Sequence, residues 1–172
     1  MKNIFDPTVA DRIRKIQSDD PNPLVTIVIP AFNEEKFLHE TLRHLSLIST
    51  RHTVEIIGVN NASTDNTGRL MEWYGLRVID ESRKGLTHAR ATGIRHARGK
   101  IILQLDADTA VPTTWIDEHV RHFEHGDVVG VSAMSYIRGV HPFVRAWCTG
   151  SKIFRGLMGE KRQVLYGIGP NL

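Results

Sequence analysis

Short stretches of β-branched and aliphatic residues alternate with stretches of helical periodicity over most of this sequence. Apolar runs of this length, each followed by a segment with apolar residues at the 3.6-residue period, are typical of strands followed by helices. The alternation predicts an α/β fold with a doubly wound, mostly parallel sheet, helices on both faces and right-handed crossovers. We expect strands at 24–29, 54–59, 76–79, 101–105 and 128–132, and helices at 34–48, 63–74, 86–97 and 113–125.

Residues 1–23 precede the first expected strand and have their own helical signal. Asp6 is a suitable N-cap, and Pro7 suits the first helical position. Val9 and Ile13 then recur on one stripe. We expect an N-terminal amphipathic extension that docks on the domain, and a membrane-surface contact is the alternative.

Composition narrows the class of protein. The chain has 172 residues with 41% hydrophobic and 24% charged residues, which suits one globular domain. Lys and Arg number 22 against 19 Asp and Glu, a mild excess that fits a small anionic ligand or a weak membrane-surface contact better than a nucleic-acid groove, which needs a clustered basic face. The single cysteine, Cys148, leaves no intrachain disulfide and is compatible with a reducing compartment. We expect a cytoplasmic protein, with a peripheral position at the inner face of the membrane as the alternative.

Polar residues follow each predicted strand. In a parallel sheet every strand-to-helix loop opens on the carboxyl edge, where ligands bind. We therefore expect the loops at 32–34, 60–65, 84–90 and 106–108 to converge there.

Two carboxylates, Asp106 and Asp108, close the strand expected at 101–105. Two residues apart on a strand, they would point to the same side. Their oxygens suit a hard divalent cation that holds a diphosphate. An acid pair that caps the next helix is the alternative for this tripeptide.

The other loops offer groups for a nucleotide. Asn60 or Asn61 can hydrogen-bond a base edge, and the apolar run 30–32 supplies a surface beside it. Lys84 and Arg90 are cations that can reach phosphate oxygens. Together these residues predict a site for a nucleoside diphosphate.

Four segments in order resemble the family 2 inverting glycosyltransferases of the GT-A fold, which is Rossmann-like. The matching motifs are VTIVIPAFNEE, VNNASTD, the Lys-Gly to Arg segment at 84–90 with Gly93, and LDAD. The similarity extends over residues 25–131 and returns at the terminal Gly-Pro-Asn. It implies a nucleotide-sugar-binding core at 24–133, followed by the start of an acceptor-side region at 134–172.

Such enzymes transfer a sugar from a nucleotide sugar, commonly the UDP form, with Mg²⁺ or Mn²⁺ on an acidic DXD motif. The resemblance implies Asp106 near the ribose or the metal and Asp108 on the metal. It places the nucleotide against Pro30, Ala31, Phe32, Glu34, Asn60, Asn61, Lys84, Arg90, Asp106, Ala107 and Asp108. The acceptor, a saccharide or a lipid-linked molecule, is not given by these motifs.

Two features depart from the family pattern. Asn60 and Asn61 stand where the family usually has an Asp pair, which predicts an altered nucleotide preference or affinity. The family's catalytic base comes from an acidic motif beyond the Gly-x-Asn loop, whereas this sequence ends at Leu172. We therefore expect a truncated acceptor half and assign no base.

Alternative functions remain at this point. A nucleotide-sugar-binding module or inactive fragment without turnover has the same motifs. A haloacid-dehalogenase-type phosphatase shares the motif at 105–109 but needs a later Lys and acidic pair. Self-association would cover apolar surface that a missing acceptor half leaves exposed.

Overall fold

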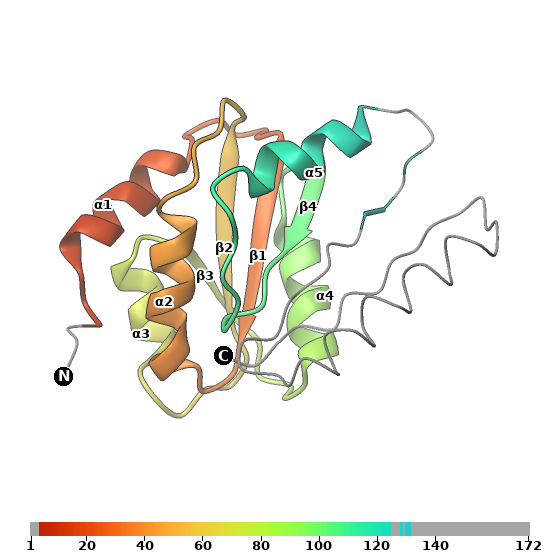
Figure 1. Ribbon diagram of the computed structural model, residues 1–172. Helices are drawn as coiled ribbons and strands as arrows, with labels where there is room; N and C mark the ends of the chain where they lie inside the picture. Colours follow the sequence, from red (N-terminus) through yellow and green to blue (C-terminus); the bar gives the residue numbers. More distant parts are fainter. Residues whose placement is uncertain (1–3, 125–127, 129, 132–172) are drawn as a thin grey trace, which may run out of the picture. The chain divides into compact units, whose positions relative to one another are not determined.

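The computed structural model describes residues 4–124, 128 and 130–131. Within them, a four-stranded parallel sheet has the order β3-β2-β1-β4 (Figure 1). The strands are β1 (Val25–Ala31), β2 (Val54–Asn60), β3 (Arg77–Asp80) and β4 (Ile101–Gln104). The helices are α1 (Pro7–Ile16), α2 (Glu35–Leu45), α3 (Thr67–Trp73), α4 (Leu86–His96) and α5 (Trp115–Phe123). The predicted doubly wound α/β fold is confirmed.

The chain divides into two compact units, residues 1–120 and residues 121–172. The sheet belongs to the first unit. The strand predicted at 128–132 and the region predicted at 134–172 lie outside the described residues, apart from residues 128, 130 and 131. No helix in the described part of the chain is long and apolar enough to cross a membrane.

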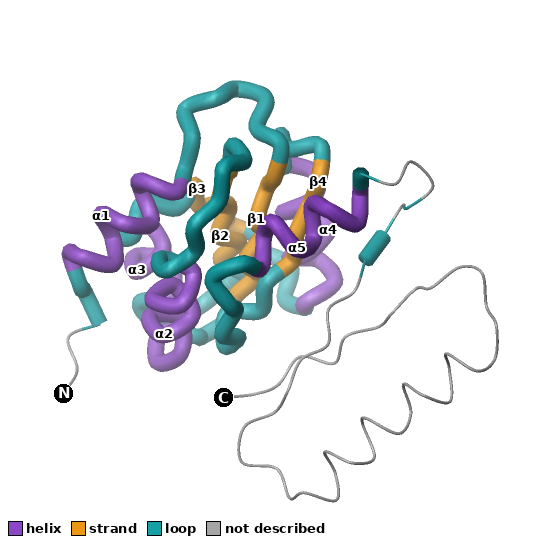
Figure 2. Tube along the Cα trace, turned by 45° about the horizontal axis from the view of Figure 1, so that its top comes forward, coloured by secondary structure: helices purple, strands orange, loops and turns teal. Residues whose placement is uncertain are grey.

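Helices cover both faces of the sheet, as predicted (Figure 2). On one face, residues of α1, α2, α3 and α5 form the larger core with the strands; examples are Ile13, Leu38, Leu70 and Ile116. On the other face, Ala89 of α4 packs on the smaller cluster formed by Val28, Ile57 and Val59. Every residue of β1 is buried, since this strand lies inside the sheet and is covered on both sides.

The N-terminal helix begins where the sequence predicts. The Asp6 side chain accepts hydrogen bonds from the backbone N–H groups of Thr8 and Val9, and Pro7 is the first helical residue. Val9 and Ile13 are buried in the larger core. The Tyr74 hydroxyl donates to the Ile4 carbonyl at 2.7 Å and so ties the preceding segment to the end of α3.

The small residues of α4 let this helix lie close to the sheet. A Cβ atom added at Gly93 would overlap Cγ1 of Val28 and lie 3.1 Å from Cγ2 of Val59. Ala89, one turn earlier, is also buried. Gly93 and Ala89 therefore form the face on which α4 contacts the sheet closely.

One prediction about the acidic strand end is wrong. β4 ends at Gln104, so Asp106 and Asp108 lie in the following turn and not on a strand. Leu105 still donates its N–H to the Val28 carbonyl, but the Thr109 N–H then bonds the Asp106 carbonyl at 3.1 Å. That local bond reverses the chain, so strand alternation does not orient the two carboxylates.

Candidate functional site

The loops after β1 and β2 are joined by hydrogen bonds at the carboxyl edge of the sheet. Oδ1 of Asn33 accepts from the Thr64 N–H at 2.8 Å, and the Asn33 N–H donates to Oγ of Ser63. The Glu34 N–H donates to Oγ1 of Thr67 at 2.9 Å. Asn33 has a φ of 56°, a left-handed conformation that Asn adopts more readily than most residues. These contacts bring together two of the loops that the sequence predicts to converge.

Asp65 binds both the first residue of α3 and the first residue of α2. Its Oδ1 accepts from the N–H and the hydroxyl of Thr67, while its Oδ2 accepts from the Glu35 N–H. Burial acts to raise the pKa of Asp65, but these hydrogen bonds outweigh burial and leave the pKa below its ordinary value. The N-cap residue of α3 is Asn66 and not Asp65, and sequence reasoning missed the link from Asp65 to α2.

The apolar run 30–32 presents one exposed ring. Pro30 and Ala31 belong to β1 and are buried. Phe32 follows the strand and is 45% exposed. The Lys84 ammonium group lies 5.3 Å from the centroid of the Phe32 ring, which is a cation–π distance. The structure therefore places two predicted site residues, from loops about fifty positions apart, side by side.

Carboxylates gather at this edge. Burial raises the pKa of Asp108, and repulsion from Asp106 adds to the effect. Burial also raises the pKa of Glu34, followed by repulsion from Asp108, Asp65 and Asp106. Four acidic side chains from three loops thus share one region of negative potential. A bound cation would relieve this repulsion.

Arg90 of α4 lies against this acidic group. Its Nη2 is 2.8 Å from Oδ1 of Asp106, an ion pair in which both side chains are about one-third exposed. Among the side-chain hydrogen bonds of the described residues, Asp108 receives only a 3.5 Å contact from the Thr109 hydroxyl. Ala107 between them is buried, and its carbonyl accepts from Oγ1 of Thr41 at 2.7 Å. Asp108 is therefore the less neutralised member of the pair.

The two predicted asparagines lie in different environments. Nδ2 of Asn60 donates to Oδ1 of Asp80 at 2.8 Å, whereas its own Oδ1 is buried without a hydrogen-bond partner among the described residues. Asn61 is 3% exposed. Its Nδ2 donates to the carbonyls of Glu81 and Arg83, and its Oδ1 accepts from the Gly85 N–H. Asn61 thus fixes the loop that carries Lys84.

Sequence reasoning missed Glu81, a buried carboxylate in this loop. A Glu two residues before an Arg in a polar loop is typical of a solvated pair, so the sequence carries no signal for its burial. Its partner Thr92 lies eleven residues further along, on α4. Asp65 also joins the acidic group, and its position after β2 was a signal for this.

The acidic group fits a cation that a ligand helps to bind. No three His, Cys, Asp or Glu side chains within the described ranges converge so as to hold a metal ion by themselves. Mg²⁺ in phosphate-transfer sites is commonly held by one or two carboxylates, with substrate phosphates and waters completing its coordination. Asp106 and Asp108, with their mutual repulsion, match that type of site.

The comparisons with known proteins agree with this geometry. A family model described as glycosyl transferase family 2 matches residues 26–171. The chain belongs to glycosyltransferase family 2. Among curated relatives of this family 2 chain, the uncharacterized glycosyltransferase EpsJ of Bacillus subtilis is 36% identical over 115 residues, or 63% of this chain. The uncharacterized glycosyltransferase YkcC of the same organism is 29% identical over 142 residues, or 78% of this chain. These matches span 33% and 43% of the two relatives, so this chain spans less than half of their length.

Solved glycosyltransferases have the same GT-A fold. TarS of S. aureus in complex with UDP has a TM-score of 0.60 and 26% identity, over 68% of this family 2 chain and 37% of TarS. The mannosyltransferase PcManGT of Pyrobaculum calidifontis, in complex with GDP-Man and Mn²⁺, has a TM-score of 0.58 and 25% identity. That match covers 81% of this chain and 45% of PcManGT. The predicted GT-A fold and the predicted family are both confirmed.

Proposed function

We propose that this chain binds a nucleoside-diphosphate sugar, in the first place a UDP-sugar, and forms the donor-binding part of an inverting glycosyltransferase. The observation that carries the proposal is the convergence of an exposed ring, two cations and a group of carboxylates at one sheet edge. Solved relatives bound to UDP and to GDP-Man support a nucleotide-sugar donor.

The base would bind between the loops after β1 and β2. Phe32 offers an exposed aromatic surface for stacking, backed by the buried Pro30 and Ala31. Both Nδ2 hydrogens of Asn61 are engaged by backbone carbonyls, so only its Oδ1 has remaining capacity to accept. An acceptor there suits a base that presents a ring N–H, as uracil and guanine do and cytosine does not, with Asn60 as a second contact.

The diphosphate would bind between the cations and the acidic turn. Lys84 and Arg90 supply positive charge to phosphate oxygens, while Asp106 and Asp108 would hold Mg²⁺ or Mn²⁺. When bound, the metal ion would stabilise the negative charge that develops on the departing diphosphate. Arg90 orients Asp106 through their 2.8 Å contact, and Ala107 anchors the turn to α2. Glu34 adds to the negative potential at the same point.

Inverting transfer also requires an acceptor hydroxyl and a general base on the opposite face of the sugar. We assign neither to the described residues, and the acceptor class stays a saccharide or a lipid-linked molecule. Because this chain spans less than half of its curated relatives, a nucleotide-sugar-binding module without turnover is the second candidate function.

Calorimetric titration of the chain with UDP, GDP and CDP in the presence of Mn²⁺ tests the donor site. We expect UDP to bind more tightly than CDP, because cytosine has no ring N–H to donate to Asn61, and the GDP titration tests whether the site also takes a purine. Incubation with UDP-glucose and UDP-GlcNAc, followed by measurement of released UDP, then separates the two candidates. Release indicates turnover, whereas binding without release favours the module. If none of the nucleotides binds, the donor-site proposal is wrong.

A further inference from the structure

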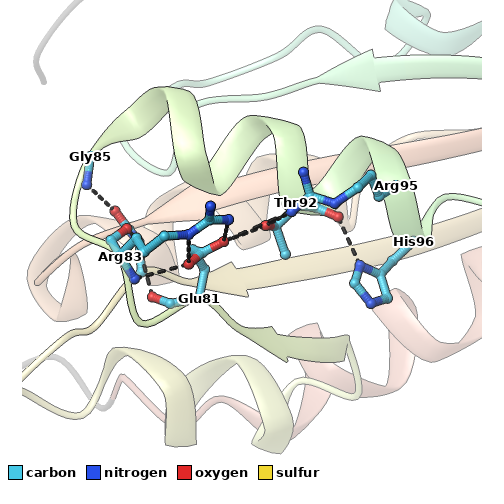
Figure 3. Close-up of polar contacts among 7 residues, drawn as sticks. Glu81, Arg83, Gly85, Thr92, Arg95 and His96 are labelled. Carbon is cyan, nitrogen blue, oxygen red and sulfur yellow. Dashed lines mark hydrogen bonds and ion pairs between the residues drawn. The ribbon is translucent and has the colours of Figure 1, made fainter.

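The carboxylate of Glu81 is folded back into its own loop, where it is buried. Oε1 accepts from the Arg83 N–H at 2.9 Å and from Nε of Arg83 at 3.0 Å, and Oε2 accepts from Nη2 of Arg83 at 2.8 Å (Figure 3). Oε2 also accepts from the hydroxyl of Thr92 at 2.5 Å. The hydrogen bonds from Arg83 and Thr92 hold the pKa of Glu81 well below its ordinary value, so the group is ionised at neutral pH.

A second anchor, Asn61, holds the backbone of the same loop. Asn61 binds the backbone of Glu81, Arg83 and Gly85 at 3.1, 2.7 and 2.8 Å. Alternate residues of the segment are thus fixed. Lys84, between two fixed residues, is exposed and directs its ammonium group to the Phe32 ring.

Glu81 also connects this loop to α4. Thr92, which donates to Glu81, accepts from Nη2 of Arg95 at 2.5 Å, and its carbonyl lies 2.9 Å from Nδ1 of His96 (Figure 3). Arg90, half a turn before Thr92 on α4, pairs with Asp106. The anchored loop and the helix that bears Arg90 are therefore linked through one carboxylate.

The ion pairs of Glu81 are a weak source of stability, because its partners Arg83 and Arg95 are 59% and 56% exposed. What such a network specifies is geometry, and here the unanchored side chain that it presents is a cation beside the exposed ring. We infer that Glu81 is a positioning residue, which holds the 81–85 loop so that Lys84 is preorganised for the phosphates of the donor. This inference rests on the donor site of the proposed function.

Affinities for uridine and for UDP distinguish this role from a merely structural one. Lys84→Met removes the cation, and Glu81→Ala removes the anchor. We expect each variant to bind UDP about tenfold more weakly and to bind uridine, which has no phosphate, within about twofold of the wild type. The double variant should bind UDP no more weakly than Lys84→Met alone, because the two residues act through the same contact.

Controls keep the outcome interpretable. Glu72→Ala, at an exposed glutamate of α3, should leave both affinities unchanged. If Glu81→Ala does not fold, Glu81→Gln carries the same test, since it preserves the volume and removes the charge. Equal losses for uridine and UDP, or additive losses in the double variant, would overturn the positioning role while the donor site stands. Absence of UDP binding by the wild type would instead overturn the donor site itself.

Discussion

Gly93→Ala tests whether α4 lies as close to the sheet as the structure shows. The new methyl group would overlap Cγ1 of Val28 and lie 3.1 Å from Cγ2 of Val59. Both valines are fully buried on neighbouring strands, so neither can move aside cheaply. We expect the helix to shift outward or the valines to leave their preferred rotamers.

The expected loss in the free energy of unfolding of Gly93→Ala follows from two opposed effects. Inserting a methyl group into a packed core costs ~1–3 kcal/mol, and this site belongs at the upper end because the overlap is with a buried side chain. Alanine recovers ~1 kcal/mol over glycine in a helix interior. The net loss in the free energy of unfolding is about 2 kcal/mol. For a chain of this size that corresponds to a fall in Tm of about 4–8 °C.

Urea denaturation followed by circular dichroism measures this loss directly. Val28→Ala is the matched background, because it removes the methyl group that Gly93→Ala would meet. In that background the added methyl should be neutral or stabilising, a non-additivity expected of residues in contact. A Gly93→Ala single variant at least as stable as the wild type would refute the close packing of α4. It would also remove the basis for the fixed position of Arg90.

Three further predictions concern other contacts. Glu55→Gln should destabilise the fold most above pH 4.5, the ordinary pKa of this group, because hydrogen bonds outweigh burial and lower the pKa of Glu55 in the folded state. In denaturation curves measured against pH, the difference in the free energy of unfolding between variant and wild type should narrow as pH falls below that value. Tyr74→Phe should cost about 1–3 kcal/mol and speed hydrogen exchange near the N-terminus, since the hydroxyl donates to Ile4 and lies 2.5 Å from Nδ1 of His39. Phe32→Ala should weaken UDP binding about 5–100-fold in calorimetry and change stability by less than about 0.5 kcal/mol, because the ring is exposed. An unchanged pH profile of stability in Glu55→Gln would contradict the first prediction, an unchanged exchange rate in Tyr74→Phe the second, and an unchanged UDP affinity in Phe32→Ala the third.

Much of the fold was predictable because its signals are local. The β-branched runs that became β1 and β2 are buried on both faces, and such runs have few other uses. The cap at Asp6 and the small face of α4 around Gly93 are likewise determined by neighbouring residues. The convergence of the loops then follows from strand direction alone.

The inner arrangement of the site was less predictable because it depends on contacts between distant residues. The side chain of Asn61 is oriented by backbone groups some twenty residues later in the chain, and the buried Glu81 carboxylate accepts a hydrogen bond from a hydroxyl on α4. The turn at Asp106 and Asp108 begins before the apolar pattern indicates, since one hydrogen bond from Thr109 reverses the chain. The hydrophobic periodicity of a sequence carries no information about such hydrogen bonds.

The most direct test of the account is calorimetric titration with UDP, with and without Mn²⁺, of the wild type, Asp108→Asn and Asp11→Asn. Asp11 is an exposed aspartate of α1 that pairs with Arg14, and its variant controls for the loss of one charge. We predict that Mn²⁺ strengthens UDP binding at least about tenfold in the wild type and in Asp11→Asn, and that Asp108→Asn abolishes this gain. UDP binding that is independent of Mn²⁺ in the wild type, or a full Mn²⁺ effect in Asp108→Asn, would contradict the account.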